Sequence, residues 1–368
     1  MKVFLAINTK TWGGGEKWHF ETASALKNKG HNITLLAYAG KDLFRKSQAA
    51  GIKTMPVSVS NLSFLNPFCL LRLYFLFRRE KPDIVVLNSS SDIKTSGVAA
   101  RLAGIRHIVF RRGSAIPVRN TRLNRLLYRY VITHIIANSE ETKRTILQHN
   151  KLLFPADKIS VIYNGINLSQ LDALPAGKLY QKNAEELVIG NMGRMVAQKG
   201  QQYLIEMARI LSKKDFRFKI LIAGTGQMKD SLKQMAIESG VEDKIVFLGF
   251  VENAKAFMES IDIFALPSVW EGFGYVLVEA MACRKPVVAF QVSSNPEIIA
   301  DSATGYLVAP LNVQEFCIKL EELGRNRELR NQFGTAGRKR AEALFDHEKS
   351  QQLVESLLLS LINIKKPN

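Results

Sequence analysis

The sequence predicts an α/β protein built from two doubly wound, Rossmann-like domains that face a central cleft. Three observations lead to this prediction. Short apolar runs alternate with segments of helical periodicity along nearly the whole chain. The apolar runs are continuous, as is typical of a parallel sheet covered on both faces. The chain of 368 residues is also long enough for two domains that each bury a core.

The first half of the chain alternates between the two kinds of segment. Each predicted strand is a short apolar run that ends in polar residues or glycine. Lys29 and Gly30 close the first helical segment, as a basic residue followed by a glycine commonly does. The predicted strands cover residues 2–8, 31–39, 82–90, 105–113 and 134–140, and the predicted helices cover 16–30 and 140–149.

The second half repeats this pattern and predicts a second sheet. Its predicted strands are residues 186–194, 218–226, 244–251, 262–268, 286–290 and 305–310, and its predicted helices are 200–214, 227–240 and 254–261.

The join between the domains is predicted within residues 167–186. This stretch lacks strong periodicity and contains Pro175 and Gly177. We expect an N-terminal domain over 1–170, a C-terminal domain over 171–345, and a final helix over 346–368 that can pack back on the N-terminal domain.

Composition excludes several classes of protein. A hydrophobic content of 46% with 23% charged residues indicates a folded globular protein. The three cysteines are scattered and the six histidines show no metal-binding spacing, which argues against a disulfide framework or a zinc site. The N-terminal apolar run is too short for a signal peptide. We therefore expect a cytoplasmic protein.

The charge is unevenly distributed along the chain. Residues 1–170 hold 26 Lys and Arg against 9 Asp and Glu, whereas the rest of the chain is nearly neutral. A basic half joined to a neutral half suggests that the basic half meets an anionic surface, either nucleic acid or anionic lipid.

Two segments of the basic half are candidates for that contact. Residues 62–81 are rich in Phe and Leu and end in Arg78, Arg79 and Lys81. They are too short and interrupted to span a bilayer, so they predict either an interfacial helix or a buried core helix. Residues 118–131 space four arginines by three or four positions, which predicts one cationic helix face for an anionic lipid or phosphorylated acceptor, or else a solvated face: Arg119, Arg122, Arg125 and Arg129.

Three segments of the neutral half follow predicted strands, at the edge where open α/β sheets bind ligands. The first, GRMVAQKG (193–200), offers Arg194 and Lys199 as donors to a diphosphate. The second, AGTG (223–226), lacks the full Rossmann or P-loop spacing. The third, SVWEGFGYVLVEAMA (268–282), combines Glu271, a glycine turn and Glu279 at the start of a predicted helix. Glycines at a helix N-terminus favour anion binding.

These segments, with VFLGFV, PVVA and NPEII between and after them, resemble family 4 of the retaining glycosyltransferases, which have the GT-B fold. The WGGGEKWHF, IANSEETKRTI and KISVIYNGIN segments are similar to the family's N-terminal half, so the resemblance covers nearly the whole chain. Its most specific part is the pair of glutamates separated by seven residues.

The resemblance implies roles for the predicted site. Glu279 would bind the ribose and Glu271 the donor sugar, while Arg194 and Lys199 would neutralise the diphosphate of a UDP- or GDP-sugar. Glu271, Arg194 and Lys199 are accordingly the predicted catalytic residues. No cofactor and no metal ion are expected. The predicted substrate-binding residues are Gly14, Gly15, Arg111, Arg112, Gly224, Gly226, Val251, Gly272, Phe273, Gly274, Tyr275, Val276 and Glu279.

The sequence departs from the family pattern at two places. Many members carry a histidine after the strand that here ends in Arg111 and Arg112, so those arginines replace it and would bind an anionic acceptor or the donor phosphate. A glycine usually occupies the position of Arg284.

The resemblance implies a retaining transfer of sugar to an envelope glycan, such as lipopolysaccharide core, O-antigen or another lipid-linked saccharide. The expected partners are a nucleotide sugar, a saccharide or lipid-linked acceptor and an anionic membrane surface on the inner face of the plasma membrane. Alternatives are a nucleotide-sugar epimerase or a glycogen or sucrose synthase-like enzyme of the same fold. Nucleic-acid binding by the basic half is an alternative of another class, without a recognised motif.

Overall fold

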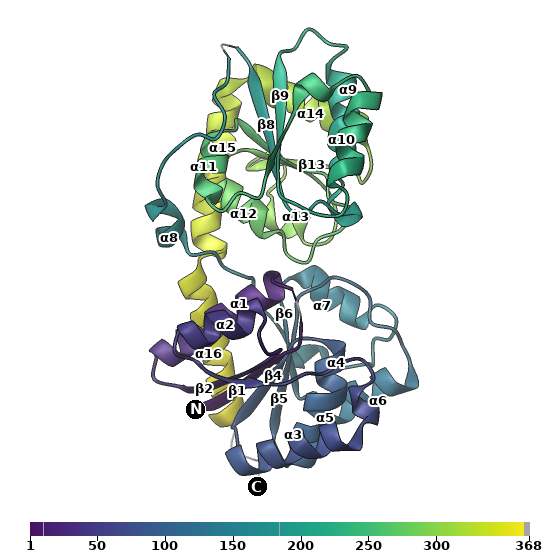
Figure 1. The fold of residues 1–368 in the computed structure, drawn as a ribbon, viewed down its shortest axis with the longest axis vertical. Coiled ribbons are helices and arrows are strands. Elements are labelled where there is room, and N and C mark those ends of the chain that lie inside the picture. Colours follow the sequence, from purple (N-terminus) through teal and green to yellow (C-terminus); the bar gives the residue numbers. More distant parts are fainter. Residues whose placement is uncertain (10, 184, 364–368) are drawn as a thin grey trace. The chain divides into compact units, whose positions relative to one another are not determined.

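The computed structural model describes residues 1–9, 11–183 and 185–363, and the chain forms two compact units (Figure 1). One unit comprises Met1–Asn164 together with Glu348–Asn368, and the other comprises Gly165–His347. The predicted boundaries at 170/171 and 345/346 lie a few residues away from these. Residues 364–368 of the predicted final helix, and residue 184 of the predicted join, lie outside the described residues.

The unit boundaries fall where two segments of the chain pair with each other. The N–H of Ile166 donates to the carbonyl of Phe345 at 2.9 Å, and the N–H of His347 donates to the carbonyl of Ile166 at 3.0 Å. A Cβ on Gly165 would lie 2.5 Å from the Cα of His347, so only glycine allows this approach.

The N-terminal unit contains a seven-stranded parallel sheet of order β3-β2-β1-β4-β5-β6-β7. Continuous runs of Val, Ile, Leu and Phe make its central strands, which are buried on both faces. The strands are β1 (Lys2–Ile7), β2 (Asn32–Ala37), β3 (Lys53–Pro56), β4 (Ile84–Leu87), β5 (His107–Arg112), β6 (His134–Ala137) and β7 (Ile159–Val161).

Helices cover both faces of this sheet. Phe77 of α3 and Leu127 of α6 belong to the core on one face, whereas Trp18 of α1 and Val354 of α16 belong to the core on the other. The final helix is thus part of the N-terminal unit. The helices are α1 (Gly14–Asn28), α2 (Asp42–Ala49), α3 (Pro67–Glu80), α4 (Ser90–Asp92), α5 (Val98–Leu102), α6 (Arg122–Tyr130), α7 (Glu140–Leu147) and α16 (His347–Asn363), with short 3₁₀ or π turns at Ser63–Leu65, Ile93–Gly97 and Ala156–Lys158.

The C-terminal unit contains a six-stranded parallel sheet of order β10-β9-β8-β11-β12-β13. Its strands are β8 (Leu187–Met192), β9 (Phe218–Ala223), β10 (Ile245–Gly249), β11 (Ile263–Leu266), β12 (Val287–Phe290) and β13 (Gly305–Val308). Its helices are α8 (Leu168–Ala173), α9 (Gln201–Leu211), α10 (Lys229–Glu238), α11 (Ala254–Glu259), α12 (Tyr275–Ala282), α13 (Asn295–Ile298), α14 (Val313–Arg325) and α15 (Arg327–Leu344), with 3₁₀ turns at Ala197–Lys199 and Glu242–Lys244.

The predicted fold of two doubly wound parallel sheets is confirmed, and each predicted strand is present. The sequence analysis missed the two outer strands β3 and β7, and it named no helix at α2, α4, α5, α8, α13, α14 or α15. The edge strand β3 is only partly buried and carries Lys53 and Pro56, and β7 is three residues long, so neither shows a long apolar run.

The two basic segments also fold differently in detail from the prediction. The helix within 62–81 starts at Pro67, where the Asn66 side chain accepts hydrogen bonds from two backbone N–H groups. The helix within 118–131 starts at Arg122 after a Thr121 N-cap, so Arg119 lies before the helix and not on its face. Within the described ranges, no helix is both long and apolar enough to cross a membrane.

Arg284 occupies a backbone conformation that favours glycine. Its φ is 55°, and it follows the C-terminus of α12. The N–H of Lys285 donates to the carbonyl of Ala280, and the N–H of Arg284 donates to that of Met281, which is the hydrogen-bond pattern of a Schellman motif.

We predict that Arg284→Gly is more stable than Arg284→Ala by roughly 1 kcal/mol, because the left-handed conformation is strained for any residue with a Cβ. Both variants lose the guanidinium group, so their difference isolates the backbone effect. Urea denaturation measures it. Equal unfolding free energies for the two variants would contradict the assignment of strain.

Candidate functional site

The strand order of the C-terminal sheet reverses at one point. The chain moves from β8 outward to β9 and β10, and then returns to β11 on the other side of β8. The loops that leave β8 and β11 therefore diverge at the carboxyl edge, and open α/β sheets bind ligands in the crevice between such loops. Lys199 lies after β8, and Glu271 lies after β11.

Lys199 and Glu271 form an ion pair at this crevice. The Nζ of Lys199 lies 2.7 Å from Oε1 and 2.9 Å from Oε2 of Glu271, and the Ser268 hydroxyl donates to Oε1 at 2.6 Å. The Glu271 side chain is only 4% exposed and that of Lys199 13%. Removing one partner would leave a buried charge without compensation, at a cost of about 3–5 kcal/mol.

The pair leaves each partner a small remaining bonding capacity. A carboxylate has about four lone-pair sites, and Lys199 and Ser268 occupy three of those on Glu271. An ammonium has three N–H donors, and its two bonds to Glu271 use two of them. Each group can therefore make about one further hydrogen bond to a ligand without breaking the pair.

Backbone contacts lock the two loops together. The N–H of Val269 donates to the carbonyl of Gln198 at 2.9 Å, and the Gln198 side chain donates to the carbonyl of Trp270 at 3.1 Å. Gly200 has a φ of 66°, and a Cβ there would lie 2.0 Å from the carbonyl oxygen of Pro267. The position of Lys199 relative to Glu271 is thus set by the backbone on both sides.

The turn between β11 and α12 leads from Glu271 into the helix. The N–H of Glu271 donates to the Ser293 hydroxyl at 3.1 Å, and Gly274 is the N-cap of α12 with a φ of 77°. The Phe273 ring is buried, and its centroid lies 5.4 Å from that of Tyr275 and 5.8 Å from that of Phe345. Gly272, Tyr275, Val276 and Glu279 are all half-buried around this helix start.

Other predicted site residues of this unit have different surroundings. A Cβ on Gly224 would lie 1.9 Å from the carbonyl oxygen of Gly193, and one on Gly226 would lie 2.2 Å from that of Met195. The loop after β9 packs directly against the loop after β8 at these two positions, so a residue larger than glycine would collide with the neighbouring backbone. Val251 follows the outermost strand β10, two strands away from β8. Arg194 is exposed, and its carbonyl accepts a hydrogen bond from the Gln201 side chain.

The N-terminal sheet also reverses its order, between β1 and β4. The Asn8 side chain, after β1, donates to Asp92, after β4, at 3.1 Å. Gly14 and Gly15 were expected in a loop but form the first turn of α1. A Cβ on Gly15 would lie 3.1 Å from the amide nitrogen of Asn88, so this glycine allows α1 to approach the end of β4.

Arg111 belongs to this polar cluster and Arg112 does not. Arg111 is buried, donates to the side chains of Asn88 and Asn164 at 3.4 and 3.1 Å, and lies 5.2 Å from the Trp18 ring centroid. Arg112 follows it in β5 and so points to the opposite face of the sheet. Its guanidinium donates to the carbonyl of Ile116, and burial lowers its pKa.

Sequence reasoning missed two buried titratable groups of this cluster. Burial and the charge of Arg111 lower the pKa of His19 to about 3, so this histidine is neutral. Burial raises the pKa of Asp92 to about 6 against the opposing hydrogen bonds from Ser89 and Asn8. The signal for Asp92 was visible, because Ser89 and Asp92 form a capping box at the start of a helix.

Two family models match the chain. The model described as Glycosyltransferase Family 4 matches residues 12–170, and the model described as Glycosyl transferases group 1 matches residues 178–340. The chain belongs to glycosyltransferase family 4.

Two curated proteins and one solved structure are similar to most of this chain. The Staphylococcus aureus capsular polysaccharide biosynthesis glycosyltransferase CapM is 28% identical over 354 residues, 90% of each chain. The Escherichia coli UDP-Gal:alpha-D-GlcNAc-diphosphoundecaprenol alpha-1,3-galactosyltransferase is 27% identical over 280 residues, 71% of this chain and 72% of that protein. The crystal structure of Anabaena Alr3699/HepE in complex with UDP has a TM-score of 0.83 at 20% identity and covers 98% of this chain and 100% of that one.

These matches confirm the predicted family, the GT-B fold and the predicted enzyme class. The chain is a glycosyltransferase, and its relatives include proteins whose names refer to the synthesis of cell-envelope glycans.

We predict a pH-dependent cost of burying Asp92 in this glycosyltransferase. In the folded protein the Asp92 carboxyl has a pKa of about 6, against an ordinary value of 3.8. The free energy of folding that this bound proton contributes is therefore fully present below about pH 4. It is lost as the pH rises through 6. Relative to Asp92→Asn, the wild type should lose up to about 3 kcal/mol between pH 4 and 7. Urea denaturation across that range measures the difference, and parallel profiles would contradict it.

Proposed function

We propose that this glycosyltransferase transfers a hexose, with retained anomeric configuration, from a UDP-sugar to a lipid-linked envelope glycan. The observation that carries the proposal is the buried Lys199–Glu271 ion pair at the point where the strand order of the C-terminal sheet reverses. This crevice is where an α/β sheet of this kind binds a nucleotide.

The diphosphate of the donor would lie between the loop after β8 and the start of α12. Lys199 can donate its third N–H to a phosphate oxygen while it keeps Glu271, and exposed Arg194 can add a bidentate contact. The positive end of the α12 dipole favours the same group. Glu279, one turn into α12, would accept hydrogen bonds from the ribose hydroxyls.

The donor sugar would lie beside Glu271. The bonding capacity left on this carboxylate suits one sugar hydroxyl, and its burial makes that hydrogen bond stronger than it would be in water. Glu271 would therefore both orient Lys199 and fix the sugar. The UDP named with the Anabaena structure and the UDP-Gal named for the E. coli relative support UDP as the nucleotide.

The proposed reaction exchanges one bond for another at the anomeric carbon. The bond to the diphosphate oxygen breaks, and the acceptor hydroxyl oxygen forms its bond on the face that the phosphate leaves. The departing phosphate oxygen takes the acceptor proton, so no protein base is required. Lys199 and Arg194 stabilise the charge that builds on the leaving group.

We propose that these two cations replace a divalent metal ion. Among residues 1–9, 11–183 and 185–363, no three or more His, Cys, Asp or Glu side chains are grouped to hold one. Independence from metal remains a prediction, for which turnover in the presence of a chelator is the direct measurement.

The acceptor would bind to the N-terminal unit. Buried Arg111 sits at the carboxyl edge of its sheet among Asn88 and Asn164, where a guanidinium can bind an anionic or hydroxyl-rich group. The E. coli relative is named for a diphosphoundecaprenol-linked acceptor, which supports an acceptor of the lipid-linked class.

We also propose that the N-terminal unit docks on an anionic membrane. Phe68 and Phe75 of α3 are 80% and 63% exposed although both are large and apolar. Arg72, Arg78 and Arg79 of the same helix are exposed beside them. Apolar side chains flanked by arginines fit the interface of an anionic bilayer. We call the exposed apolar set the α3 surface: Leu62, Leu65, Phe68, Leu71 and Phe75.

The carboxylates in the segment from α3 to α6 do not oppose that docking. In the segment from Pro67 to Tyr130, all of which the structure describes, three carboxylates occur. Glu80 is paired with Lys2, Asp83 accepts a hydrogen bond from the backbone N–H of Lys2, and Asp92 is buried.

We predict that Lys199→Met weakens UDP binding about 10- to 100-fold, because it removes a charge-assisted hydrogen bond to the diphosphate. Lys182→Met is the matched control, since Lys182 pairs with Asp262 at the opposite edge of the same sheet. Isothermal titration with UDP measures both.

Glu271→Gln should keep UDP binding within about tenfold and lose at least about 100-fold in turnover of UDP-sugar.

Wild-type UDP affinity in Lys199→Met would overturn the donor site. Wild-type turnover by Glu271→Gln would overturn the role of that carboxylate.

We predict that replacing Phe68 and Phe75 by Ser reduces binding to phosphatidylglycerol vesicles at least about tenfold, since each buried Phe contributes about 1.5–3 kcal/mol. Leu353→Ser is the control, because Leu353 is an exposed apolar residue on α16 of the same unit. Co-sedimentation measures vesicle binding, and circular dichroism with thermal unfolding checks that the variants are folded. Equal sedimentation of all three proteins would refute the α3 surface as the contact.

A further inference from the structure

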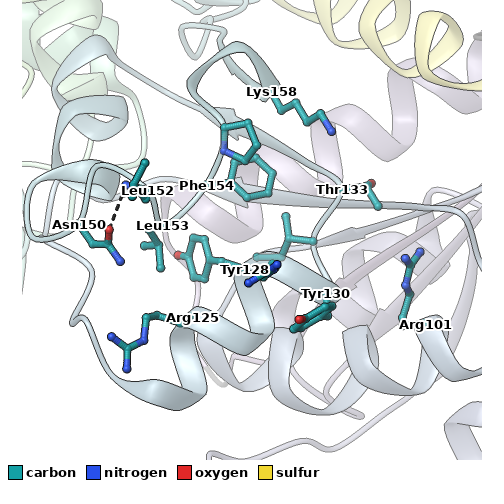
Figure 2. A pocket seen from close by; sticks show the side chains of 13 residues that line it. Arg101, Arg125, Tyr128, Tyr130, Thr133, Asn150, Leu152, Leu153, Phe154 and Lys158 are labelled. Carbon is teal, nitrogen blue, oxygen red and sulfur yellow. Dashed lines mark hydrogen bonds between the residues drawn. The ribbon is translucent and has the colours of Figure 1, made fainter.

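A cavity of about 590 Å³ opens in the N-terminal unit at the amino ends of β6 and β7 (Figure 2). Thr133 and Lys158 line it, and they immediately precede these two strands. Arg111 lies at the carboxyl end of β5, so the cavity is at the edge of the sheet opposite to the polar cluster. The cavity is therefore separate from the polar cluster around Arg111.

The cavity is strongly cationic. Arg101, Arg125, Arg129 and Lys158 line it, and no Asp or Glu is among its lining residues, all of which are described. All four cations are exposed, and none of them is paired with a carboxylate of the described ranges. Figure 2 shows Arg125 and Arg101 at opposite ends of the cavity and Lys158 above it in the view. Such a set of cations attracts an anionic group.

The remaining lining is mostly apolar and aromatic. The Tyr128 and Phe154 rings pack edge to face with their centroids 6.3 Å apart and are both buried. Leu152 lies on the rim and is 93% exposed. The N–H of Leu152 donates to the Asn150 side chain at 3.0 Å, which fixes the turn that carries it (Figure 2). An apolar side chain held outward beside four cations matches a ligand that is both anionic and apolar.

The size of the cavity also limits the ligand. A volume of about 590 Å³ is in the range of sites for drug-sized molecules and exceeds what an inorganic anion needs. A nucleotide base would require several polar groups in fixed positions, whereas Thr133 and Asn150 are the uncharged polar side chains of the lining apart from two tyrosines. A flexible apolar chain has no such requirement.

We propose that this cavity binds a phosphate ester carried on an apolar chain. The phosphate lies beside Arg125 and Arg129, which are one turn apart on α6, and the chain runs along Phe154 and Leu152. The site is separate from the donor site, and its ligand is the phosphate of a membrane lipid. Its biological role rests on the proposed membrane association, whereas the binding itself does not.

The test uses farnesyl phosphate, below its micelle concentration, as a probe of the full-length chain by isothermal titration. Farnesol and inorganic phosphate supply the chain and the anion alone. The variant Arg125→Gln/Arg129→Gln removes two lining cations, and Leu152→Ser removes the apolar rim. Arg122→Gln is the matched control, because Arg122 is an exposed arginine of the same helix α6 that does not line the cavity.

We expect farnesyl phosphate to bind the wild type and Arg122→Gln alike. The double variant should bind at least about tenfold more weakly, because it loses charge-assisted hydrogen bonds to the phosphate. Leu152→Ser should also bind more weakly, because it loses apolar contact with the chain. Equal binding by the double variant and the wild type would overturn the site. Inorganic phosphate binding as tightly as farnesyl phosphate would overturn the assignment of an apolar chain.

A titration with UDP separates this inference from the proposed donor site. UDP affinity should be the same in all of these proteins, since the donor residues belong to the other unit. Loss of farnesyl phosphate binding, with intact UDP binding and an unchanged circular dichroism spectrum, supports the cavity. Unchanged farnesyl phosphate binding in the folded double variant overturns it.

Discussion

The reversal of strand order in each sheet is the constraint on which the rest of the structure depends. A parallel sheet that grows outward in one direction gives no opening at its carboxyl edge, because successive loops cover it. Here the chain returns to the middle twice, at β1 and β4 in one unit and at β8 and β11 in the other. Each return separates two neighbouring loops and leaves room for side chains to gather.

In the C-terminal unit, the Lys199–Glu271 ion pair lies at this opening, and backbone contacts fix the positions of the two residues. Gly200 approaches Pro267, and Gly224 approaches Gly193, at distances that a Cβ would forbid. The Gly200–Pro267 contact holds the loops after β8 and β11 close enough for Lys199 to reach Glu271. The resulting ion pair is buried, with Ser268 as a further polar partner. A buried pair contributes little net stability but fixes the geometry of its groups. That preorganisation is what a site for a diphosphate and a sugar requires.

The N-terminal unit places its charge on two opposite edges of the sheet. Arg111 is buried among asparagines at the carboxyl edge, whereas the arginines of α5 and α6 surround a cavity at the amino edge. The helix layer between them carries the α3 surface. The proposed acceptor cluster, membrane surface and lipid-phosphate cavity would each use part of the net positive charge, nearly all of which lies in one half of the chain.

Much of the fold was predictable because it rests on local patterns. Apolar runs such as residues 84–87 are too short for helices and too continuous for exposed strands, so they predict buried parallel strands. The edge strand β3 escaped prediction because half of its residues face solvent. The start of α12 at Tyr275 agrees with the predicted helix, because the glycine turn before it is a strong local signal.

Candidate site residues could be named from the sequence, whereas the contacts between them could not. Residue type and the family resemblance pointed to Lys199 and Glu271, but their ion pair joins residues 72 positions apart and depends on the order of the strands. The difference between Arg111 and Arg112 follows from the alternation of side chains along β5 and could have been inferred from it. Gly224 and Gly226 looked like ligand contacts, yet the backbone of a neighbouring loop explains them. The cavity beside α6 draws on four separate segments, and no local pattern marks it.

The most direct test of this account is a crystal structure of the protein with UDP-galactose or another UDP-sugar bound. The account predicts that a phosphate oxygen lies within hydrogen-bond distance of the Lys199 ammonium while the Lys199–Glu271 pair is kept, with the sugar beside Glu271 and the ribose beside Glu279. A donor bound with its diphosphate away from Lys199, or only at the carboxyl edge of the N-terminal sheet, would contradict it.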